Sequence, residues 1–239
     1  MKNKKIIMTG GSGRFAKVFK SIVHKEKIFY PSKKILDIKN LNSIKNYIKK
    51  IKPDYLIHCA ALSRPMNIHD KKINESITTN IIGTANIVKI CSQKKIKLIY
   101  FSTNYVYPGI KGNYSEENPI MPTNNYAWSK LGGECSAQLY KNSLILRVSM
   151  TEKPFVHKKA FTNVKTSFLY HEDVAKILFK ILNQKGIINI GGKAQYIFNF
   201  AFKENKNIKK KHLKKNNKTS IPLDSSLNIT KLKKILKVY

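Results

Sequence analysis

The sequence predicts an α/β protein built on a doubly wound parallel sheet, with a small, shortened lobe toward the C-terminus. Two observations predict this class. Short apolar runs of strand length alternate with longer segments that repeat apolar residues at helical spacing. In addition, the first apolar run leads directly into a glycine-rich turn that opens the first helical segment. Sheets of this kind bind ligands at the carboxyl ends of their strands, so we expect the functional residues there.

The elements can be placed in order along the chain. Strands are predicted over 5–9, 28–30, 34–37, 55–59, 97–101, 143–148 and 186–190. Helices are predicted over 15–23, 41–51, 75–91, 126–140, 173–182 and 229–236. The regularity weakens beyond residue 150, and the Lys- and Asn-rich stretch 203–218 is expected to be an exposed loop or a frayed helix.

The charge balance is strongly basic, with 46 basic residues against 13 acidic ones and a formal net charge of +33. Only three of the basic residues are arginines, Arg14, Arg64 and Arg147. A protein that grips phosphates and bases is expected to use more Arg, because the planar guanidinium binds them bidentately. We therefore predict no specific nucleic-acid partner, and a positive field that speeds the capture of small polyanions at low salt.

The cysteines and the absence of targeting patterns predict a cytoplasmic protein. Cys59, Cys91 and Cys135 are odd in number and lack metal-ligand spacing, so we expect buried free thiols. The apolar run near the N-terminus is too short for a signal peptide, and no run of about 18 apolar residues predicts a membrane span. The histidines also lack metal spacing, so no metal site is predicted. A homodimer is the general expectation for oligomers.

The turn between the first strand and the first helix has the pattern of a pyrophosphate site. Gly10 allows the tight turn, and Gly13 lets backbone N–H groups approach a pyrophosphate. Ala16 is small enough for the helix to pack close to the sheet. The helix N-terminus adds a partial positive charge. Arg14 either pairs with a cofactor phosphate or lies at the surface; the pattern leaves both open. The turn predicts a dinucleotide in a Rossmann-type fold.

The segment after the second strand favours NADP(H) over NAD(H). NAD enzymes usually place an acidic residue there to hold the ribose hydroxyls. Residues 30–34 read Tyr-Pro-Ser-Lys-Lys and contain no acid. Ser32 and Lys33 suit a 2′-phosphate instead. NAD(H) stays the alternative, because Lys is abundant throughout the chain.

Tyr126 and Lys130 are four residues apart in a predicted helix and therefore share one face. A free phenol has a pKa near 10, and a nearby ammonium and an oxidised nicotinamide would lower it. Tyr126 could then donate a proton to a carbonyl oxygen while hydride reaches the carbon. Ser102 and Thr103 end a buried strand at the ligand edge. A hydroxyl there binds a substrate carbonyl or caps the following loop.

Together these stretches resemble the extended short-chain dehydrogenase/reductases, above all the dTDP-4-dehydrorhamnose reductase branch. The matching stretches include TGGSGRFA (9–16), PDYLIHCAAL (53–62), FSTNYVYPG (101–109), PTNNYAWSKLGGE (122–134), LRVSM (146–150) and HEDVAKI (171–177). The resemblance implies the catalytic residues Thr103, Tyr126 and Lys130. It implies cofactor contacts from Gly10, Gly13, Arg14, Phe15, Ala16, Ser32, Lys33, Asp37, Ile38, Ala60, Ala61, Leu62, Asn80, Ser102, Tyr126 and Lys130.

Asn104 and Tyr105 fall where this branch has an Asp-Tyr pair at the substrate, so a contact of that carboxylate is altered or lost. The resemblance implies an NADP-binding domain over 1–150, to which 171–192 return. It assigns 151–170 and 193–239 to a lean substrate-binding lobe.

The resemblance implies an NADP(H)-dependent reductase of a nucleotide-activated 4-keto-6-deoxy sugar, in the synthesis of polysaccharide precursors. An epimerase of the same fold is the nearest rival. A dehydratase is disfavoured, because Asn104-Tyr105 offers no carboxylate next to Thr103. A non-catalytic, NADP-binding regulatory protein is a rival of another class.

Overall fold

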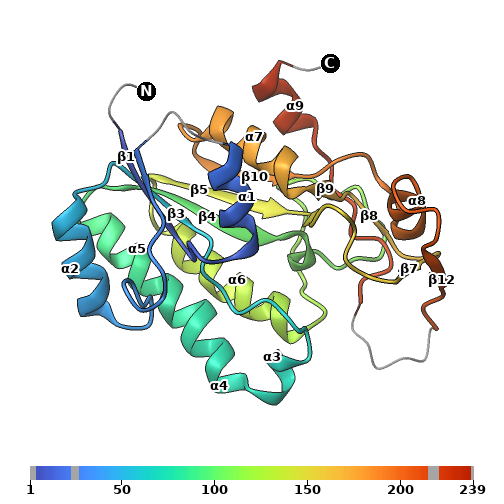
Figure 1. Cartoon of the computed structure of the whole chain (residues 1–239), viewed down its shortest axis with the longest axis horizontal. Helices are drawn as coiled ribbons and strands as arrows, with labels where there is room; N and C mark the ends of the chain where they lie inside the picture. The colour runs from blue at the N-terminus through green and yellow to red at the C-terminus, as the bar shows by residue number, and fades with distance from the viewer. Residues whose placement is uncertain (1–3, 23–26, 215–220, 238–239) are drawn as a thin grey trace.

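The computed structural model describes residues 4–22, 27–214 and 221–237 and is built around one six-stranded sheet (Figure 1). The strands run in the order β10-β5-β4-β3-β1-β2 and are all parallel. They are β1 (Lys5–Thr9), β2 (Lys27–Phe29), β3 (Tyr55–His58), β4 (Lys97–Thr103), β5 (Ser143–Val148) and β10 (Gly186–Ile190). The winding reverses between β1 and β3, where such sheets open a ligand crevice. The predicted doubly wound fold is confirmed.

Helices cover both faces of the sheet (Figure 1). One face carries α1 (Arg14–Ile22), α7 (His171–Ile181) and α9 (Thr230–Leu236), and the other carries α2 (Leu41–Ile51), α5 (Gly83–Gln93) and α6 (Asn125–Gln138). Alternate residues of each strand enter two different cores, since Ile6 and Met8 of β1 pack with α1 and α7 while Ile7 packs with α2 and α5. A strand buried on both faces reads as a continuous apolar run, which explains why these strands were predictable.

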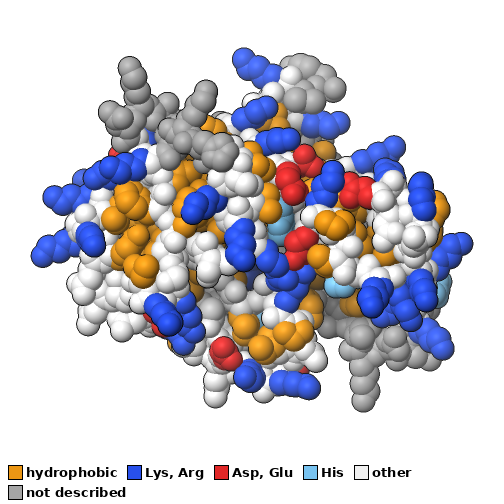
Figure 2. Space-filling view, in the orientation of Figure 1, with side chains coloured by type: hydrophobic (Ala, Val, Ile, Leu, Met, Phe, Trp, Pro, Cys, Tyr) orange, Lys and Arg blue, Asp and Glu red, His pale blue; other side chains and the backbone are white. Residues whose placement is uncertain are grey.

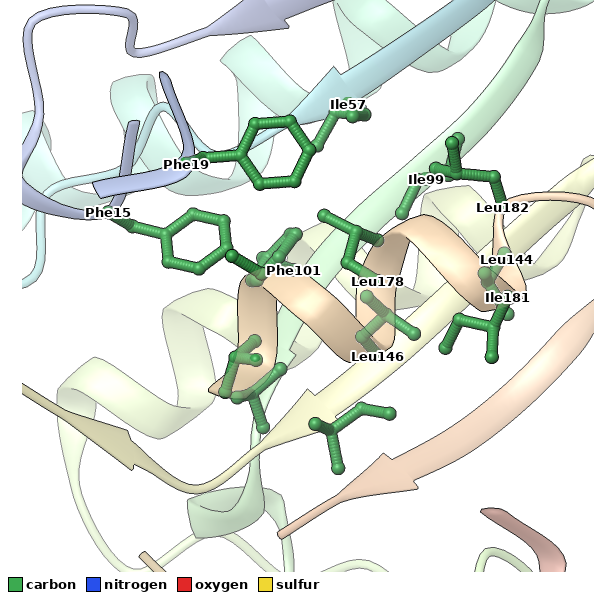
Figure 3. Packing of buried hydrophobic residues seen from close by; sticks show 14 of the residues in the cluster. Phe15, Phe19, Ile57, Ile99, Phe101, Leu144, Leu146, Leu178, Ile181 and Leu182 are labelled. Atoms are coloured by element: carbon green, nitrogen blue, oxygen red, sulfur yellow. The ribbon is translucent and has the colours of Figure 1, made fainter. Parts of the chain in front are cut away.

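The core under α1 and α7 fixes the helix that follows the glycine turn. Figure 3 shows Phe15 and Phe19 facing Phe101 and Leu178 across this core. The Phe15 and Phe101 ring centroids are 4.9 Å apart, so the start of α1 is packed directly against the end of β4. The glycine turn and the carboxyl end of β4 are thereby held as neighbours.

Between β3 and α5 the chain is helical but irregular. The short helices α3 (Ile68–Lys71) and α4 (Ile73–Ser76) lead into η1, a π-helical segment over Ile77–Ile82. The single helix predicted over 75–91 is therefore interrupted and extends to Gln93. A π turn holds more residues than an α turn and rotates the side chains that follow it. Asn80, which is 1% exposed, lies within this π-helical segment.

The strand predicted over 34–37 is wrong. These residues form turns, in which the N–H groups of Ile35 and Leu36 donate to the carbonyl of Ser32. Leu36 and Ile38 are buried in the core with α2 and α5, so their apolar character reflects packing of a loop. The helix predicted over 15–23 is α1, and Val23 lies outside the described residues.

Beyond residue 150, short paired strands surround a separate hydrophobic cluster. The pairs are β6 (Met150–Thr151) with β9 (Leu169–Tyr170), β7 (Lys159–Phe161) with β12 (Lys209–Lys211), and β8 (Lys165–Thr166) with β11 (Gln195–Tyr196). Helix α8 (Ile197–Phe202) contributes Phe200 to this cluster. The strand β12 replaces part of the loop expected over 203–218, of which 215–218 lie outside the described residues.

The molecular surface carries basic side chains around most of the outline in Figure 2, while several acidic ones gather near its middle.

The three cysteines differ in exposure. Cys91 is buried and Cys59 half-buried, but Cys135 is exposed, contrary to the expectation of three buried thiols. Within the described part of the chain, no helix has the length and apolar character to span a bilayer, and no His, Cys, Asp and Glu side chains gather as a metal site.

Candidate active site

The sequence-predicted residues come together at the carboxyl edge of the sheet. The glycine turn follows β1, residues 59–62 follow β3, and Thr103 ends β4. These three strands are neighbours in the sheet, and parallel strands end at the same edge. Tyr126 and Lys130 reach this edge from α6, which packs against β4.

The glycine turn leaves no room for a side chain at Gly10. Gly10 has φ +72°, and a side chain there would place Cβ 2.9 Å from the backbone nitrogen of Ala60. The N–H of Gly13 donates to the carbonyl of Gly10 at 2.8 Å, which closes the turn before Arg14 begins α1. A bare backbone at the start of a helix fits a dinucleotide diphosphate, because its N–H groups and the helix dipole attract an anion.

The loop after β2 lies beside the glycine turn. Gly11 donates its N–H to the carbonyl of Pro31 at 3.3 Å, so the exposed Lys33 and the half-buried Ser32 follow immediately next to the turn. Further along, the Asp37 carboxylate accepts the Lys39 N–H at 3.0 Å and remains half-buried.

The neighbouring Ile38 is buried, and its carbonyl accepts a hydrogen bond from Asn86 at 3.1 Å. These contacts hold the segment predicted to face adenine in one conformation.

Asn80 connects the loop after β3 to α6. Its Oδ1 accepts the Leu62 N–H at 2.8 Å, and its Nδ2 donates to the Leu62 carbonyl at 2.9 Å and to Ser129 Oγ at 2.8 Å. The Ala60 N–H, earlier in the same loop, donates to Thr9 Oγ1 at 3.3 Å. The loop 60–62 is therefore held from β1 and from η1, with Ala61 between the two attachments.

Tyr126 lies in the first turn of α6, whose N-terminus is capped by Asn124 accepting the Ala127 N–H at 2.9 Å. The side chain of Thr103 lies close enough to Tyr126 to lower the pKa of its phenol. Burial outweighs this effect and raises the pKa of Tyr126 to about 12. In the protein alone the phenol is thus a firmly protonated donor, and the predicted lowering of its pKa by Lys130 is not found.

Lys130 lies one helical turn beyond Tyr126 and is 4% exposed. Its Nζ is 4.4 Å from the centroid of the Tyr100 ring, which is a favourable cation–π distance. Burial lowers the pKa of Lys130 to about 8, while Cys59 and Glu134 act in the opposite direction. The ammonium is therefore close to its titration point at neutral pH.

A buried ion pair behind Thr103 was not predicted from the sequence. Ser102 is 6% exposed and donates its hydroxyl to Glu134 Oε2 at 2.5 Å. Glu134 Oε1 in turn lies 2.7 Å from Nη2 of Arg147. The structure thus directs the Ser102 hydroxyl, expected at the cofactor, into this ion pair.

Asn104 and Tyr105 have different environments. Asn104 is 4% exposed, and its Nδ2 donates to the carbonyl and to the Oγ of Ser225, both at 3.0 Å. Its amide therefore connects β4 to the C-terminal segment. Tyr105 is half-buried, and burial raises the pKa of its phenol while Arg64 opposes the rise, which places Arg64 near this side of the site.

Two further side chains lie at the site without any sequence signal. His69 packs its ring 5.2 Å from that of Tyr126, and its Nδ1 lies 2.7 Å from Ser76 Oγ. Glu152 forms ion pairs with both Arg14 and Arg64. These residues come from a short helix and from the lobe, where no periodic pattern marks them.

Comparison with known proteins identifies a family and a fold. Residues 4–151 match the sequence profile of the RmlD substrate binding domain. The methionine adenosyltransferase 2 subunit beta of Xenopus laevis is 31% identical over 119 residues, which cover 49% of this chain and 35% of that protein. The probable low-salt glycan biosynthesis reductase Agl14 of Haloferax volcanii is 30% identical over 118 residues, which cover 48% of this chain and 38% of that protein. The chain thus spans well under half the length of these relatives.

Among solved structures, the dTDP-4-dehydrorhamnose reductase of Bacillus anthracis in complex with NADP superimposes with a TM-score of 0.88. The match covers 99% of this chain and 94% of that one at 21% identity, which is a likeness of fold.

Proposed function

We propose that this chain, which belongs to the RmlD substrate binding domain family, is an NADP(H)-dependent reductase of a nucleotide-activated 4-keto-6-deoxy sugar. The observation that carries the proposal is the closeness of the Thr103 side chain to the Tyr126 phenol, whose pKa it lowers, with the buried Lys130 one turn further along α6. A proton donor, an orienting hydroxyl and a cation at the ligand edge of such a sheet suit carbonyl reduction. The names of the Haloferax and Bacillus reductases support the same reaction class.

The side chains have distinct roles in the proposed reaction. When bound, NADPH supplies the hydride that is added to the keto carbon. Tyr126 donates its phenolic proton to the keto oxygen, so that the carbonyl becomes a secondary alcohol. With a pKa of about 12, Tyr126 keeps this proton until negative charge develops on the oxygen. Thr103 orients Tyr126 and the carbonyl, and the Lys130 ammonium stabilises the phenolate that remains.

The cofactor is proposed to lie across the glycine turn, with its diphosphate on Gly10 and Gly13. Ser32 and Lys33 lie next to that turn and would receive a 2′-phosphate, which supports NADP(H) over NAD(H). The complex of the Bacillus reductase with NADP supports this choice. We assign the nucleotide sugar to the lobe of residues 151–170 and 193–239, which has a hydrophobic cluster of its own.

The test is turnover of NADPH with a dTDP- or UDP-linked 4-keto-6-deoxy sugar. Tyr126→Phe is expected to lose turnover by about 10²- to 10⁴-fold, because general acid catalysis contributes that much. NADPH binding, followed by its fluorescence, should persist. Tyr140→Phe, which removes a hydroxyl bound to the Ile96 carbonyl near the end of α6, is the matched control. Robust turnover by Tyr126→Phe would exclude the mechanism.

A second candidate is a regulatory subunit that holds NADP(H) without chemistry. The methionine adenosyltransferase 2 subunit beta of Xenopus laevis favours it, since that relative is named as a subunit and not as a reductase. Tight NADPH binding without turnover across a panel of nucleotide sugars would support this candidate. An epimerase remains the nearest catalytic rival, and product analysis with NAD⁺ or NADP⁺ distinguishes it.

A further inference from the structure

Two of the three arginines in the chain converge on a single carboxylate. Arg14 Nη1 lies 3.2 Å from Glu152 Oε1, and Arg64 Nη1 lies 2.8 Å from Glu152 Oε2. Arg14 begins α1 directly after the glycine turn, Arg64 follows β3, and Glu152 follows β6. The remaining arginine, Arg147, is buried with Glu134. In a chain with 46 basic residues, almost all lysine, this placement of Arg is specific.

Glu152 does not occupy all the donors of the two arginines. The two guanidinium groups share this one carboxylate. Each guanidinium carries five N–H donors, and Glu152 contacts one nitrogen of each. The Arg14 and Arg64 side chains are 53% and 37% exposed, whereas that of Glu152 is 16% exposed. The arginines can therefore reach a ligand while remaining anchored.

Unsatisfied polar groups continue beside the cluster. His171, at the start of α7, is 5% exposed and packs edge-on against Phe15, with ring centroids 5.7 Å apart. Its Nδ1 is buried and has no hydrogen-bond partner within the described residues. Glu152, Glu172 and Arg14 all act electrostatically on His171, so this unpaired nitrogen belongs to the same neighbourhood, as does Oε2 of Glu172, which is buried and likewise has no partner among the described residues. The partly exposed guanidinium groups of Arg14 and Arg64 suit an anion with several oxygens.

We propose that Arg14 and Arg64 form a clamp for the diphosphate group of a nucleotide ligand, and that Glu152 occupies the position of one phosphate until the ligand displaces it. A carboxylate and a phosphate bind the same planar fork, but a diphosphate carries more charge and more acceptor oxygens. The position of Arg14 after the glycine turn points to the diphosphate of the dinucleotide. The identity of that ligand as NADP(H) rests on the proposed function.

Glu152→Gln and Arg64→Gln give opposite expectations. Glu152→Gln removes the charge that competes with the ligand and should lower the Kd for NADPH about tenfold. Arg64→Gln removes one charge-assisted contact with the ligand and should raise this Kd about tenfold. Both shifts should shrink as the salt concentration rises. Glu204→Gln is the matched control, because Glu204 pairs with Lys153 at 3.3 Å in the same lobe and loses the same charge.

The experiment uses the full chain and has two ligand arms. Fluorescence titration measures NADPH, calorimetry measures dTDP and UDP, and thermal unfolding verifies that each variant is folded. Opposite shifts for Glu152→Gln and Arg64→Gln with NADPH support the clamp at the cofactor. The same shifts with dTDP or UDP but no binding of NADPH would support the clamp and refute the proposed cofactor.

Two results would overturn the clamp. One is NADPH binding in which Glu152→Gln behaves like Glu204→Gln, which leaves the proposed function intact. The other is the absence of binding of any of the three diphosphates.

Discussion

Glu134 and Arg147 form an ion pair that is almost completely enclosed behind the carboxyl end of β4. Oε1 and Nη2 are 2.7 Å apart, and the two side chains are 0% and 3% exposed. Arg147 also donates to the hydroxyl of Tyr107 at 2.8 Å, and Ser102 donates to Glu134. The pair thus links α6, β4 and β5 at the level of Thr103.

Removing one member of this pair should be costly. Glu134→Gln is expected to destabilise the protein by about 3–5 kcal/mol, because it leaves Arg147 buried without a counter-charge. Urea unfolding measures the change. The double variant Glu134→Leu/Arg147→Met removes both charges and should be less destabilised than Glu134→Gln. A double variant as unstable as the sum of its single variants would contradict this account.

Gly133 of α6 should tolerate no side chain. A Cβ there would lie 2.6 Å from the carbonyl oxygen of Asn80 and 2.7 Å from the hydroxyl of Tyr100. Gly133→Ala is therefore expected to lower stability by about 1–3 kcal/mol despite the better helix propensity of Ala. Gly132→Ala is the control, since its Cβ would meet only the movable Ile81 side chain at 2.9 Å. Equal melting temperatures for the two variants would refute the expectation.

The buried Lys130 predicts a rise of stability with pH. Its pKa is about 8 in the folded protein against 10.5 when unperturbed, so between these values the unfolded state binds more protons. The free energy of unfolding should therefore increase from pH 8 toward 10.5, by roughly 3 kcal/mol for this group. Cys59 and Cys91, whose thiol pKa values are raised by desolvation, act in the opposite direction above about pH 9.

The contribution of Lys130 is isolated by comparing the wild type with Lys130→Met in urea unfolding at a series of pH values. The difference between their pH slopes reports this one residue. Parallel profiles for the two proteins from pH 8 to 9 would show that Lys130 is not desolvated.

Thr103 is expected to serve the reaction through its hydroxyl. Its side chain lowers the pKa of the nearby Tyr126 phenol, and its Oγ1 accepts the Tyr105 N–H at 3.2 Å. Thr103→Val should reduce kcat by about 10²-fold, as loss of an orienting group in acid catalysis does. Thr103→Ser, which retains the hydroxyl, should stay within about tenfold of the wild type. Equal turnover of Thr103→Val and Thr103→Ser would assign the hydroxyl to capping alone.

The parts of the site that follow local patterns were predictable. A glycine turn after a buried strand, and Tyr126 and Lys130 at helical spacing, are encoded within a few residues. The prediction of a strand over 34–37 was wrong because a loop that packs on a core contains apolar residues in the same pattern as a short strand. Side-chain charge state also escaped prediction, since the raised pKa of Tyr126 depends on how deeply the fold encloses the phenol.

Contacts between distant segments were beyond any local pattern. Glu152 is 88 positions from Arg64 in the chain, and nothing near either residue specifies the other. The ion pair of Glu134 with Arg147 likewise depends on the packing of α6 against β5. Such pairs follow from the topology of the sheet. The periodicity of apolar residues predicts the fold class but does not predict which side chains meet.

The hydrogen bond between Asn104 and Ser225 has a consequence for the order in which parts of the protein can fold during synthesis. Its two residues are separated by 121 positions, so on the ribosome Asn104 emerges long before its partner exists. The sheet strands up to β5 can pair earlier, because their residues are synthesised earlier. Residue 104 adjoins Thr103, so the carboxyl end of β4 acquires this support only after Ser225 has been translated.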